Sequence, residues 1–347
     1  MSYSLRIAVL WRPGRNVEMQ QAFSGGAIAD DAQEEAELLR DGLADAGHHA
    51  FLVQWRRDDI ARTLHDLRRF SVDLVFNASS DQEVCLLHAA GIPYCGSGPD
   101  LVTTSKATRK KILMYAGLRT SPFVVIGREG KVTGGGLTLE DLRRGWEPRK
   151  PLQYPLFVKP IAGRGSSGVS DDSIVYDLPS LIRQVEMIVC RLGQGALVEN
   201  YLVGQEVTVG IIGDPPVALT PLEIEYNGAK TNTYEHKMDK EIMHCPARLS
   251  PLATTRVQDT ARRVFDVLGA RDFARVDTIV DKEGLPHVLE INTFAGLHIL
   301  TGIEKRAHAS YIGVMAKASG LSRAALLDAI TSSAMTRSRR SAANACP

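Results

Sequence analysis

Hydrophobic and polar positions follow a regular rhythm in the first hundred residues of the chain. Three short apolar runs, at 5–11, 50–55 and 73–78, have the length and composition of buried β-strands. Between the first two, residues 30–48 carry apolar positions at helical spacing, and Gly47 supplies a stop signal. Strands that alternate with helices predict a parallel α/β layer in this part of the chain.

The alternation of predicted strands and helices changes beyond residue 103. Ser105 is placed to cap a helix over 106–118, and residues 121–127 have the pattern of a strand. Residues 128–153 are rich in Gly, Arg and Pro, which predicts a surface excursion. From Leu156 onward the pattern predicts mainly short strands.

Two longer segments interrupt these strands with helical periodicity, at 178–193 and 251–270. The last residues, 335–347, are small, polar and basic, and we expect a frayed end there.

The bulk composition is that of an ordinary globular protein. Among 347 residues, 41 Lys and Arg nearly balance 40 Asp and Glu, so there is no electrostatic argument for a nucleic-acid or membrane partner. No apolar run approaches the roughly 18 residues of a membrane helix, and the first segment reads as a strand instead of a signal peptide. Five scattered cysteines favour reduced thiols in the cytoplasm.

The stretch LFVKPIAGRGSSGVS, residues 156–170, has the Gly-x-Gly-x-x-Gly pattern of several nucleotide-binding loops, at Gly163, Gly165 and Gly168. A dinucleotide-binding loop would open a helix, but the residues after Gly168 are strand-like and turn-like. A protein-kinase loop has its lysine on a later strand, whereas Lys159 precedes this loop. No Gly-Lys-Ser or Gly-Lys-Thr ends it, as a Walker A loop requires.

Two interpretations of this loop remain open from its residues alone. Its backbone amides and the hydroxyls of Ser166 and Ser167 could close over phosphates as a flap, with Lys159 supplying positive charge. Alternatively, the stretch is a surface hairpin with a glycine-rich turn.

Residues 273–293 have the pattern of two strands joined by the turn sequence DKEGLP. A turn centred in that sequence would pair Asp277 with Glu290 and Arg275 with Asn292, and these polar side chains would share one face. The opposite face would carry Ala274, Val276, Leu289 and Ile291. Such oxygen ligands are costly to group without a cation and suit Mg²⁺, although a salt-bridged surface cluster is the alternative.

Several segments in order resemble the ATP-grasp superfamily, and D-alanine–D-alanine ligases in particular. They are YPLFVKPIAGRGSSGVS, ALVENYLVGQEVTVGI, FARVDTIV, HVLEINTFAGL and the stretch 91–126, so the resemblance spans roughly residues 70–330. It implies an α/β (α+β) ATP-grasp fold with two α+β subdomains that clamp ATP. The expected division is an N-terminal parallel α/β domain (1–103), a central subdomain (104–195), a C-terminal subdomain (196–332) and a flexible tail (333–347).

The resemblance also implies nucleotide-binding roles. Adenine would meet the Glu199 carboxylate and the backbone of Tyr201 and Leu202, and the ribose hydroxyls would meet Glu206. The residues expected to bind phosphate are Lys106, Lys159, Lys237 and the flap, namely Gly163, Gly165, Ser166, Ser167 and Gly168.

The remaining matches concern metal and catalysis. Asp277, Glu290 and Asn292 match the ligands of two Mg²⁺ ions, with Mn²⁺ as an alternative metal. Arg275 and the backbone of Gly296 match the site that holds an oxyanion, and Lys237, Ser166 and Ser167 complete the implied catalytic set. The implied reaction converts a carboxylate to an acyl phosphate, which an amine attacks to give an amide, ADP and phosphate.

Departures from the ligase pattern fall in the substrate pocket. The usual Gly-Gly-x-Ser-x-Glu segment after the first strand is absent, and the usual His-Gly-x-x-Gly-Glu-Asp-Gly run is reduced to NASSDQE. Met238 stands where these ligases commonly have Tyr, Ala295 where they have Pro, and Thr301-Gly302 where we expect their Ser-Leu.

We therefore expect small-molecule carboxylate and amine substrates other than D-alanine, in a protein without nucleic-acid or membrane partners. The resemblance also implies a homodimer. The alternatives are an authentic D-alanine–D-alanine ligase with a divergent pocket, a nucleotide-binding protein without turnover, and a small-molecule kinase on the same fold.

Overall fold

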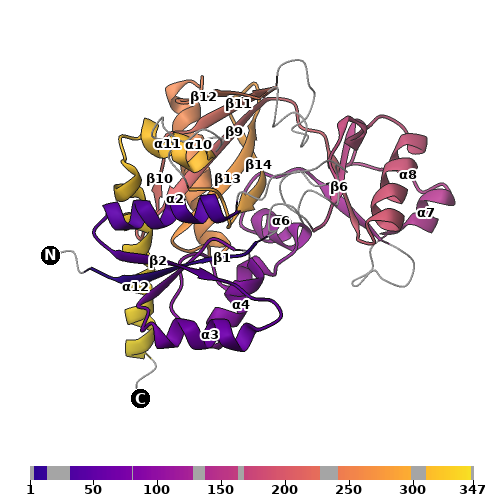
Figure 1. Ribbon diagram of the computed structural model, residues 1–347. Coiled ribbons are helices and arrows are strands. Elements are labelled where there is room, and N and C mark those ends of the chain that lie inside the picture. Colours follow the sequence, from indigo (N-terminus) through magenta and orange to yellow (C-terminus); the bar gives the residue numbers. More distant parts are fainter. Residues whose placement is uncertain are drawn as a thin grey trace.

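The computed structural model describes residues 4–13, 32–79, 81–127, 137–162, 168–226, 241–297 and 310–344. These residues form three sheets with their covering helices (Figure 1). The N-terminal sheet and the C-terminal sheet lie together, and the central subdomain extends to one side of them. None of the described helices is long and apolar enough to cross a membrane.

The N-terminal domain is the parallel layer that the alternation predicted, with strand order β2-β1-β3. Its elements are β1 (Arg6–Trp11), α2 (Ala32–Asp45), β2 (His49–Gln54), α3 (Ile60–Arg69), β3 (Leu74–Asn77), α4 (Asp81–Ala89) and α5 (Pro99–Val102). The central strand β1 is apolar through residues 7–10, which are fully buried. Helix α2 covers one face of the sheet, and α3 and α4 cover the other, so β1 has no polar face.

The central subdomain has a five-stranded sheet of order β5-β4-β8-β6-β7. Its elements are α6 (Lys106–Tyr115), β4 (Phe123–Gly127), β5 (Leu137–Thr138), α7 (Leu139–Arg143), β6 (Leu156–Pro160), a 3₁₀ turn (Asp171–Ser173), β7 (Ile174–Val175), α8 (Leu178–Glu186), a π-helical turn (Met187–Arg191) and β8 (Ala196–Asn200). Helices α7 and α8 pack on one face of this sheet, away from the rest of the molecule (Figure 1).

Part of the predicted surface excursion at 128–153 is instead folded into this core. Residues 137–143 form β5 and α7, and Leu139 and Leu142 are buried. Thr138 and Asp141 form a capping box that satisfies the first amides of α7. The Gly, Arg and Pro content of the whole stretch predicted a loop, although this short segment within it is an amphipathic helix.

The C-terminal subdomain has a six-stranded sheet of order β12-β11-β9-β13-β14, with β10 paired to β9. Its elements are β9 (Gln205–Ile212), β10 (Val217–Ala218), β11 (Leu222–Tyr226), β12 (Glu241–His244), α10 (Pro251–Val267), β13 (Phe273–Val280), β14 (Pro286–Asn292), α11 (Tyr311–Ala318) and α12 (Arg323–Asn344). Helices α10 and α6 cover one face of the sheet. Helix α11 packs on the other face, in a core shared with the N-terminal domain.

The final helix differs from the flexible tail that we expected over 333–347. Helix α12 continues to Asn344, and its buried Leu326, Leu327 and Ile330 join the core of the N-terminal domain. Arg337 donates to the Asp272 carboxylate at 2.6 Å. The basic composition that suggested a solvated end therefore includes an arginine with a buried partner.

Asp272 ties three parts of the chain together, and its removal should destabilise the fold. Its carboxylate is 2 % exposed and accepts hydrogen bonds from the Gly96 amide, the Ser333 hydroxyl and Arg337. Asp272→Ala leaves the Gly96 amide and the Ser333 hydroxyl buried without their partner and removes the carboxylate that neutralises Arg337, so we expect a loss of about 3 kcal/mol in the free energy of unfolding by urea. Asp259→Ala, which removes an exposed carboxylate from α10, should cost less than about 0.5 kcal/mol. Equal losses in the two variants would contradict this account.

A second stabilising pair gives a pH-dependent prediction. Hydrogen bonds from Arg248 lower the pKa of the buried Glu223 carboxyl from its ordinary value of 4.5 to about 2. Because the pKa is lower in the folded protein, the pair stabilises fully above pH 4.5 and its contribution is lost as the pH falls toward 2. Glu223→Gln should cost about 2 kcal/mol at pH 7 in urea unfolding, since Arg248 is half exposed. The difference from the wild type should shrink below pH 4.5; a constant difference would refute the assignment.

Candidate active site

The acidic hairpin has the register that its turn sequence predicted. Strands β13 and β14 are antiparallel, with Arg275 opposite Asn292 and Asp277 opposite Glu290. The four polar side chains consequently converge on one face of the C-terminal sheet, with the backbone of β9 beside them.

A β-bulge follows these pairs and corrects one part of the expected pattern. Thr278 lies opposite Val288, so that Leu289 is the extra residue on β14. Val288 is fully buried in the core position that we expected for Leu289, which is only partly buried. The bulge lies next to Glu290, where it can re-aim that side chain relative to a regular ladder.

Asp277 is the centre of the cluster. It accepts two hydrogen bonds from Arg275, from Nε at 2.8 Å and Nη2 at 2.9 Å, and one from Asn292 Nδ2 at 2.7 Å. Thr208 on β9 donates to its Oδ1 at 2.6 Å, a contact that no sequence motif indicated. The Asn292 amide also lies 3.4 Å from Glu290 Oε1, which joins the two carboxylates through one side chain.

Arg275 is a cation whose side chain is 17 % exposed and is held on two sides. Burial acts to lower the pKa of its guanidinium, but the Asp277 charge and hydrogen bonds outweigh burial, and the pKa is raised. The guanidinium also lies over the Tyr311 ring, 4.7 Å from its centroid, a cation–π contact. Tyr311 begins α11 and is distant in sequence, so periodicity in the hairpin could not reveal it.

The donor set fits a hard divalent cation. Two carboxylates and an amide side chain converge within hydrogen-bonding distance, and Mg²⁺ typically takes one or two protein carboxylates plus phosphate oxygens. The Asn292 nitrogen faces both carboxylates here, so cation binding would require that amide to rotate and present its oxygen. Asp277, Glu290 and Asn292 are the residues that would hold the ion.

Lys106 connects the cluster to the central subdomain. It is the first residue of α6, whose N-cap Ser105 accepts a hydrogen bond from the Thr108 amide. Its Nζ lies 3.4 Å from Glu290 Oε2, and its side chain is 22 % exposed. This ion pair joins the first turn of α6 to strand β14.

A second charged cluster lies in the central subdomain, around Glu199 on β8. Lys159 Nζ on β6 lies 2.7 Å from Glu199 Oε1, and Lys110 Nζ on α6 lies 2.8 Å from Oε2. All three residues are at least 93 % buried. The pairing of Lys159 with Glu199 follows from neighbouring strands, whereas Lys110 was not among the predicted site residues.

The electrostatics of this cluster favour an ionised Glu199. Burial acts to raise the pKa of the Glu199 carboxyl, but Lys159 and Lys110 together outweigh burial and lower it. Burial also acts against the Lys159 ammonium, yet Glu199 and Glu290 raise its pKa overall. For Lys110, burial prevails and its pKa is lowered. Glu290 acts on both lysines, which brings the two clusters within electrostatic range of each other.

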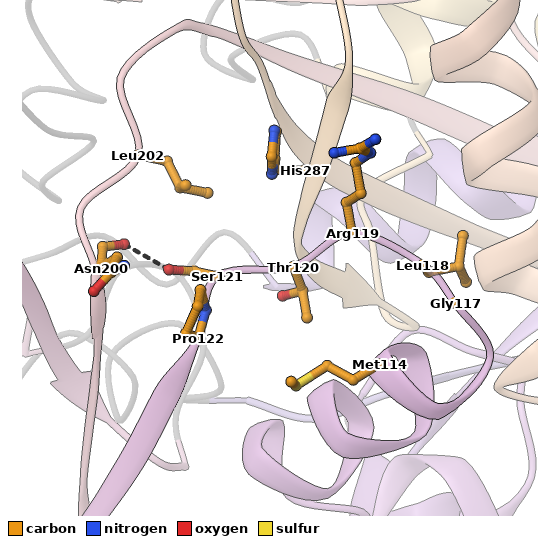
Figure 2. A pocket seen from close by; sticks show the side chains of 10 residues that line it. All are labelled: Met114, Gly117, Leu118, Arg119, Thr120, Ser121, Pro122, Asn200, Leu202 and His287. Atoms are coloured by element: carbon orange, nitrogen blue, oxygen red, sulfur yellow. Dashed lines mark hydrogen bonds between the residues drawn. The ribbon is translucent and has the colours of Figure 1, made fainter. Parts of the chain in front are cut away.

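Residues 117–122, which lead from α6 to β4, and residues 200–204, which lead from β8 to β9, line a pocket of about 450 Å³ (Figure 2). Ser121 joins them by donating to the Asn200 carbonyl at 2.7 Å. The Tyr201 amide donates to the Pro155 carbonyl at 3.0 Å, so this amide is not available for an adenine ring. The Leu202 amide makes no hydrogen bond within the described ranges.

The other predicted nucleotide residues are only partly placed. Glu206 lies on β9 and acts electrostatically on Lys159. Gly168 ends the predicted flap with φ of +74°, and a Cβ there would lie 2.7 Å from the Pro160 ring, so only glycine fits. Gly296 is exposed in the segment after β14. The predicted residues outside the described ranges are Gly163, Gly165, Ser166, Ser167 and Lys237, together with the pocket positions Met238 and Thr301-Gly302.

Comparison with known proteins gives concordant results. The family model described as D-ala D-ala ligase C-terminus matches residues 112–332. The D-alanine–D-alanine ligase of Lawsonia intracellularis is 31 % identical over 80 % of this chain and 87 % of its own length. The uncharacterised protein y4sG of Sinorhizobium fredii is 30 % identical over 71 % of this chain and 67 % of its own length.

A solved structure agrees at the level of the fold. The D-alanine–D-alanine ligase of Bacillus anthracis complexed with ATP has a TM-score of 0.69 and 22 % identity, over 97 % of this chain and 100 % of its own. The mixed architecture that the sequence resemblance implied is confirmed. The chain belongs to the D-alanine–D-alanine ligase-like family of the ATP-grasp superfamily, which is a family of ATP-dependent ligases that form carbon–nitrogen bonds.

Proposed function

We propose that this protein joins a small-molecule carboxylate to an amine other than D-alanine, through an acyl phosphate made from ATP. The observation that carries the proposal is the convergence of Arg275, Asp277, Glu290 and Asn292 on one face of the C-terminal sheet. Lys106 connects this cluster to the subdomain that carries Lys159 and Glu199. A nucleotide between the two sheets would have its base at Glu199 and its terminal phosphate at the acidic cluster.

Different residues would bind the nucleotide, align its phosphates and neutralise charge during activation of the carboxylate. Glu199 accepts a hydrogen bond from the adenine amino group, Leu202 offers its amide to the ring, and Glu206 meets the ribose. Lys106 and Lys159, with Lys237 and the flap residues Ser166 and Ser167, hold the phosphates in line with the carboxylate. Mg²⁺ at Asp277, Glu290 and Asn292, in two sites, would neutralise charge on the transferring phosphoryl group. Closure of the flap excludes water, which otherwise hydrolyses the acyl phosphate.

Amide formation follows at the same face. The carboxylate oxygen attacks the γ-phosphorus and ADP leaves; the amine then attacks the acyl carbon and phosphate leaves. Arg275 and the Gly296 amide would hold the oxyanion of the tetrahedral intermediate. Arg275 is suited to this because it stays cationic and is fixed by Asp277 and Tyr311.

Departures in the pocket support a substrate other than D-alanine. The segment that would carry a glutamate toward the first amine is absent after β1, and Met238, Ala295 and Thr301-Gly302 differ from the usual ligase residues. Where the protein lacks the hydrogen-bond partners of a substrate, the polar groups of that substrate are left unpaired on binding. Such a mismatch lowers kcat/KM strongly. We also expect that the protein forms a homodimer and binds neither nucleic acid nor a membrane. These expectations stay predictions.

An authentic D-alanine–D-alanine ligase with a divergent pocket is the second candidate. The observation in its favour is that relatives at 31 % identity over most of the chain carry that name.

The deciding experiment measures release of ADP and free phosphate with Mg-ATP, across pools of L- and D-amino acids and other small carboxylates, with mass spectrometry of the products. An Asp277→Ala, Glu290→Ala double variant is the blank. A product mass equal to two substrates minus water establishes the ligase and identifies both partners.

The other outcomes separate the alternatives. A D-alanyl-D-alanine product would favour the second candidate. A phosphorylated product without free phosphate would indicate a kinase on this fold. ATP binding without turnover above the blank in every pool would overturn the ligase proposal in favour of a binding protein.

A further inference from the structure

Among the residues that the structure describes, Lys110 is a fully buried charge near the proposed nucleotide site to which the proposed mechanism gives no role. Its side chain is 3 % exposed, and its ammonium contacts Glu199 and donates to the Thr120 hydroxyl. Burying an ammonium group costs several kcal/mol unless partners compensate it. An aliphatic residue of similar size would fill this position between α6 and β8 without that cost, so the charge itself calls for an explanation.

The two lysines on Glu199 are not equivalent. Lys159 lies on the strand that leads into the glycine-rich loop, where Glu206 and Glu290 also act on it. A phosphate group would draw Lys159 away from Glu199 Oε1 and free that oxygen. Lys110 contacts the other oxygen, Oε2, and is anchored by Thr120, so it would stay in place.

We propose that Lys110 is a positioning residue that keeps Glu199 an ionised, acceptor-only carboxylate, and thereby makes the site select a base with an amino group at position 6. An ionised carboxylate accepts hydrogen bonds only, whereas a protonated one also donates. Adenine offers an amino donor to such an acceptor, while a 6-oxo purine offers a carbonyl oxygen, which the carboxylate repels. This inference rests on the proposed use of ATP.

A second contact ties the same ammonium to the acidic cluster. The Thr120 hydroxyl that accepts from Lys110 donates in turn to the Val288 carbonyl at 2.8 Å. Thr120 lies in the segment between α6 and β4 (Figure 2), and Val288 is two residues from Glu290 on β14. Lys110 thus joins the base-selecting carboxylate to the strand that carries a metal ligand, which fixes the distance between the two ends of a bound nucleotide.

The test compares ATP with ITP, whose base differs in carrying an oxygen at position 6 and a proton at N1. The wild type should prefer ATP by at least about 100-fold in kcat/KM. In Lys110→Met we expect this preference to fall at least about tenfold, mainly through a higher KM for ATP, while the KM values of carboxylate and amine stay unchanged. Lys111→Met, which removes the exposed neighbouring charge on α6, is the matched control and should keep the wild-type preference.

The outcomes are separable. A wild type that uses ITP as well as ATP, or a Lys110→Met variant with an unchanged preference, overturns the inference. Where the methionine variant does not fold, Lys110→Gln removes the charge but keeps a donor, and the same loss of preference is expected. If no substrate pair supports turnover, the proposed function fails and not this inference, which is then decided by the ratio of ATP to ITP dissociation constants in calorimetry.

Discussion

Glu290→Gln is expected to lower kcat/KM for ATP by about a thousandfold, because it removes a negative charge from the proposed metal site. Asp277 would remain with Arg275, Asn292 and Thr208 bonded to it, so the fold should persist. The side chain of Glu290 is 31 % exposed, which keeps the structural cost of the substitution small. Steady-state kinetics at increasing magnesium concentrations measure the effect, and high magnesium should recover part of the lost activity.

Asp281→Asn is the matched control for this prediction. Asp281 lies at the turn end of the same hairpin, where it pairs with His287 at 2.8 Å, away from the acidic cluster. Its substitution removes a carboxylate charge from the same strand pair but should leave turnover and magnesium dependence within about twofold. Similar losses in the two variants would mean that the hairpin's stability, and not cation binding, explains the effect of Glu290.

The parts of the fold that sequence could predict are those set by local pattern. Period-two alternation and a single turn sequence were enough to pair Asp277 with Glu290 and Arg275 with Asn292. The bulge at Leu289 was not predictable, since the position of a bulge depends on how β14 packs against the rest of the sheet. Likewise the composition of the polar, basic end could not reveal that Arg337 of α12 pairs with the buried Asp272, which is 65 residues away in sequence.

The candidate site shows the same division. Lys159 and Glu199 could be proposed from sequence because they lie in segments that resemble the family, and the structure pairs them at 2.7 Å. Their roles toward a nucleotide stay predictions. Lys110, Thr208 and Tyr311 could not, because each acts on a charged residue contributed by a different element. The sequence pattern of an amphipathic helix predicts that its lysines are exposed to solvent. Lys110 is instead buried in an ion pair, because β8 packs close to α6.

Arg275→Lys should lower kcat by about 10²–10³, although it keeps the positive charge. A lysine ammonium is a point charge that cannot make the fork to both Asp277 oxygens or stack in the same way on Tyr311. The charge would then be free to move away from the developing oxyanion, and fixed geometry is what makes such a donor effective. ATP binding, measured by calorimetry, should change less than about threefold because Arg275 is not among the proposed nucleotide contacts.

Arg248→Lys is the control that separates the loss of a two-bond arginine–carboxylate contact from the loss of catalysis. Arg248 makes an equivalent fork to Glu223 in the same subdomain, so its substitution should lower stability without lowering kcat. If Arg275→Lys weakens ATP binding as much as it weakens turnover, Arg275 supports the nucleotide and the oxyanion assignment is wrong. If it leaves kcat intact, the oxyanion must be held by other groups, and the Gly296 amide becomes the residue to test.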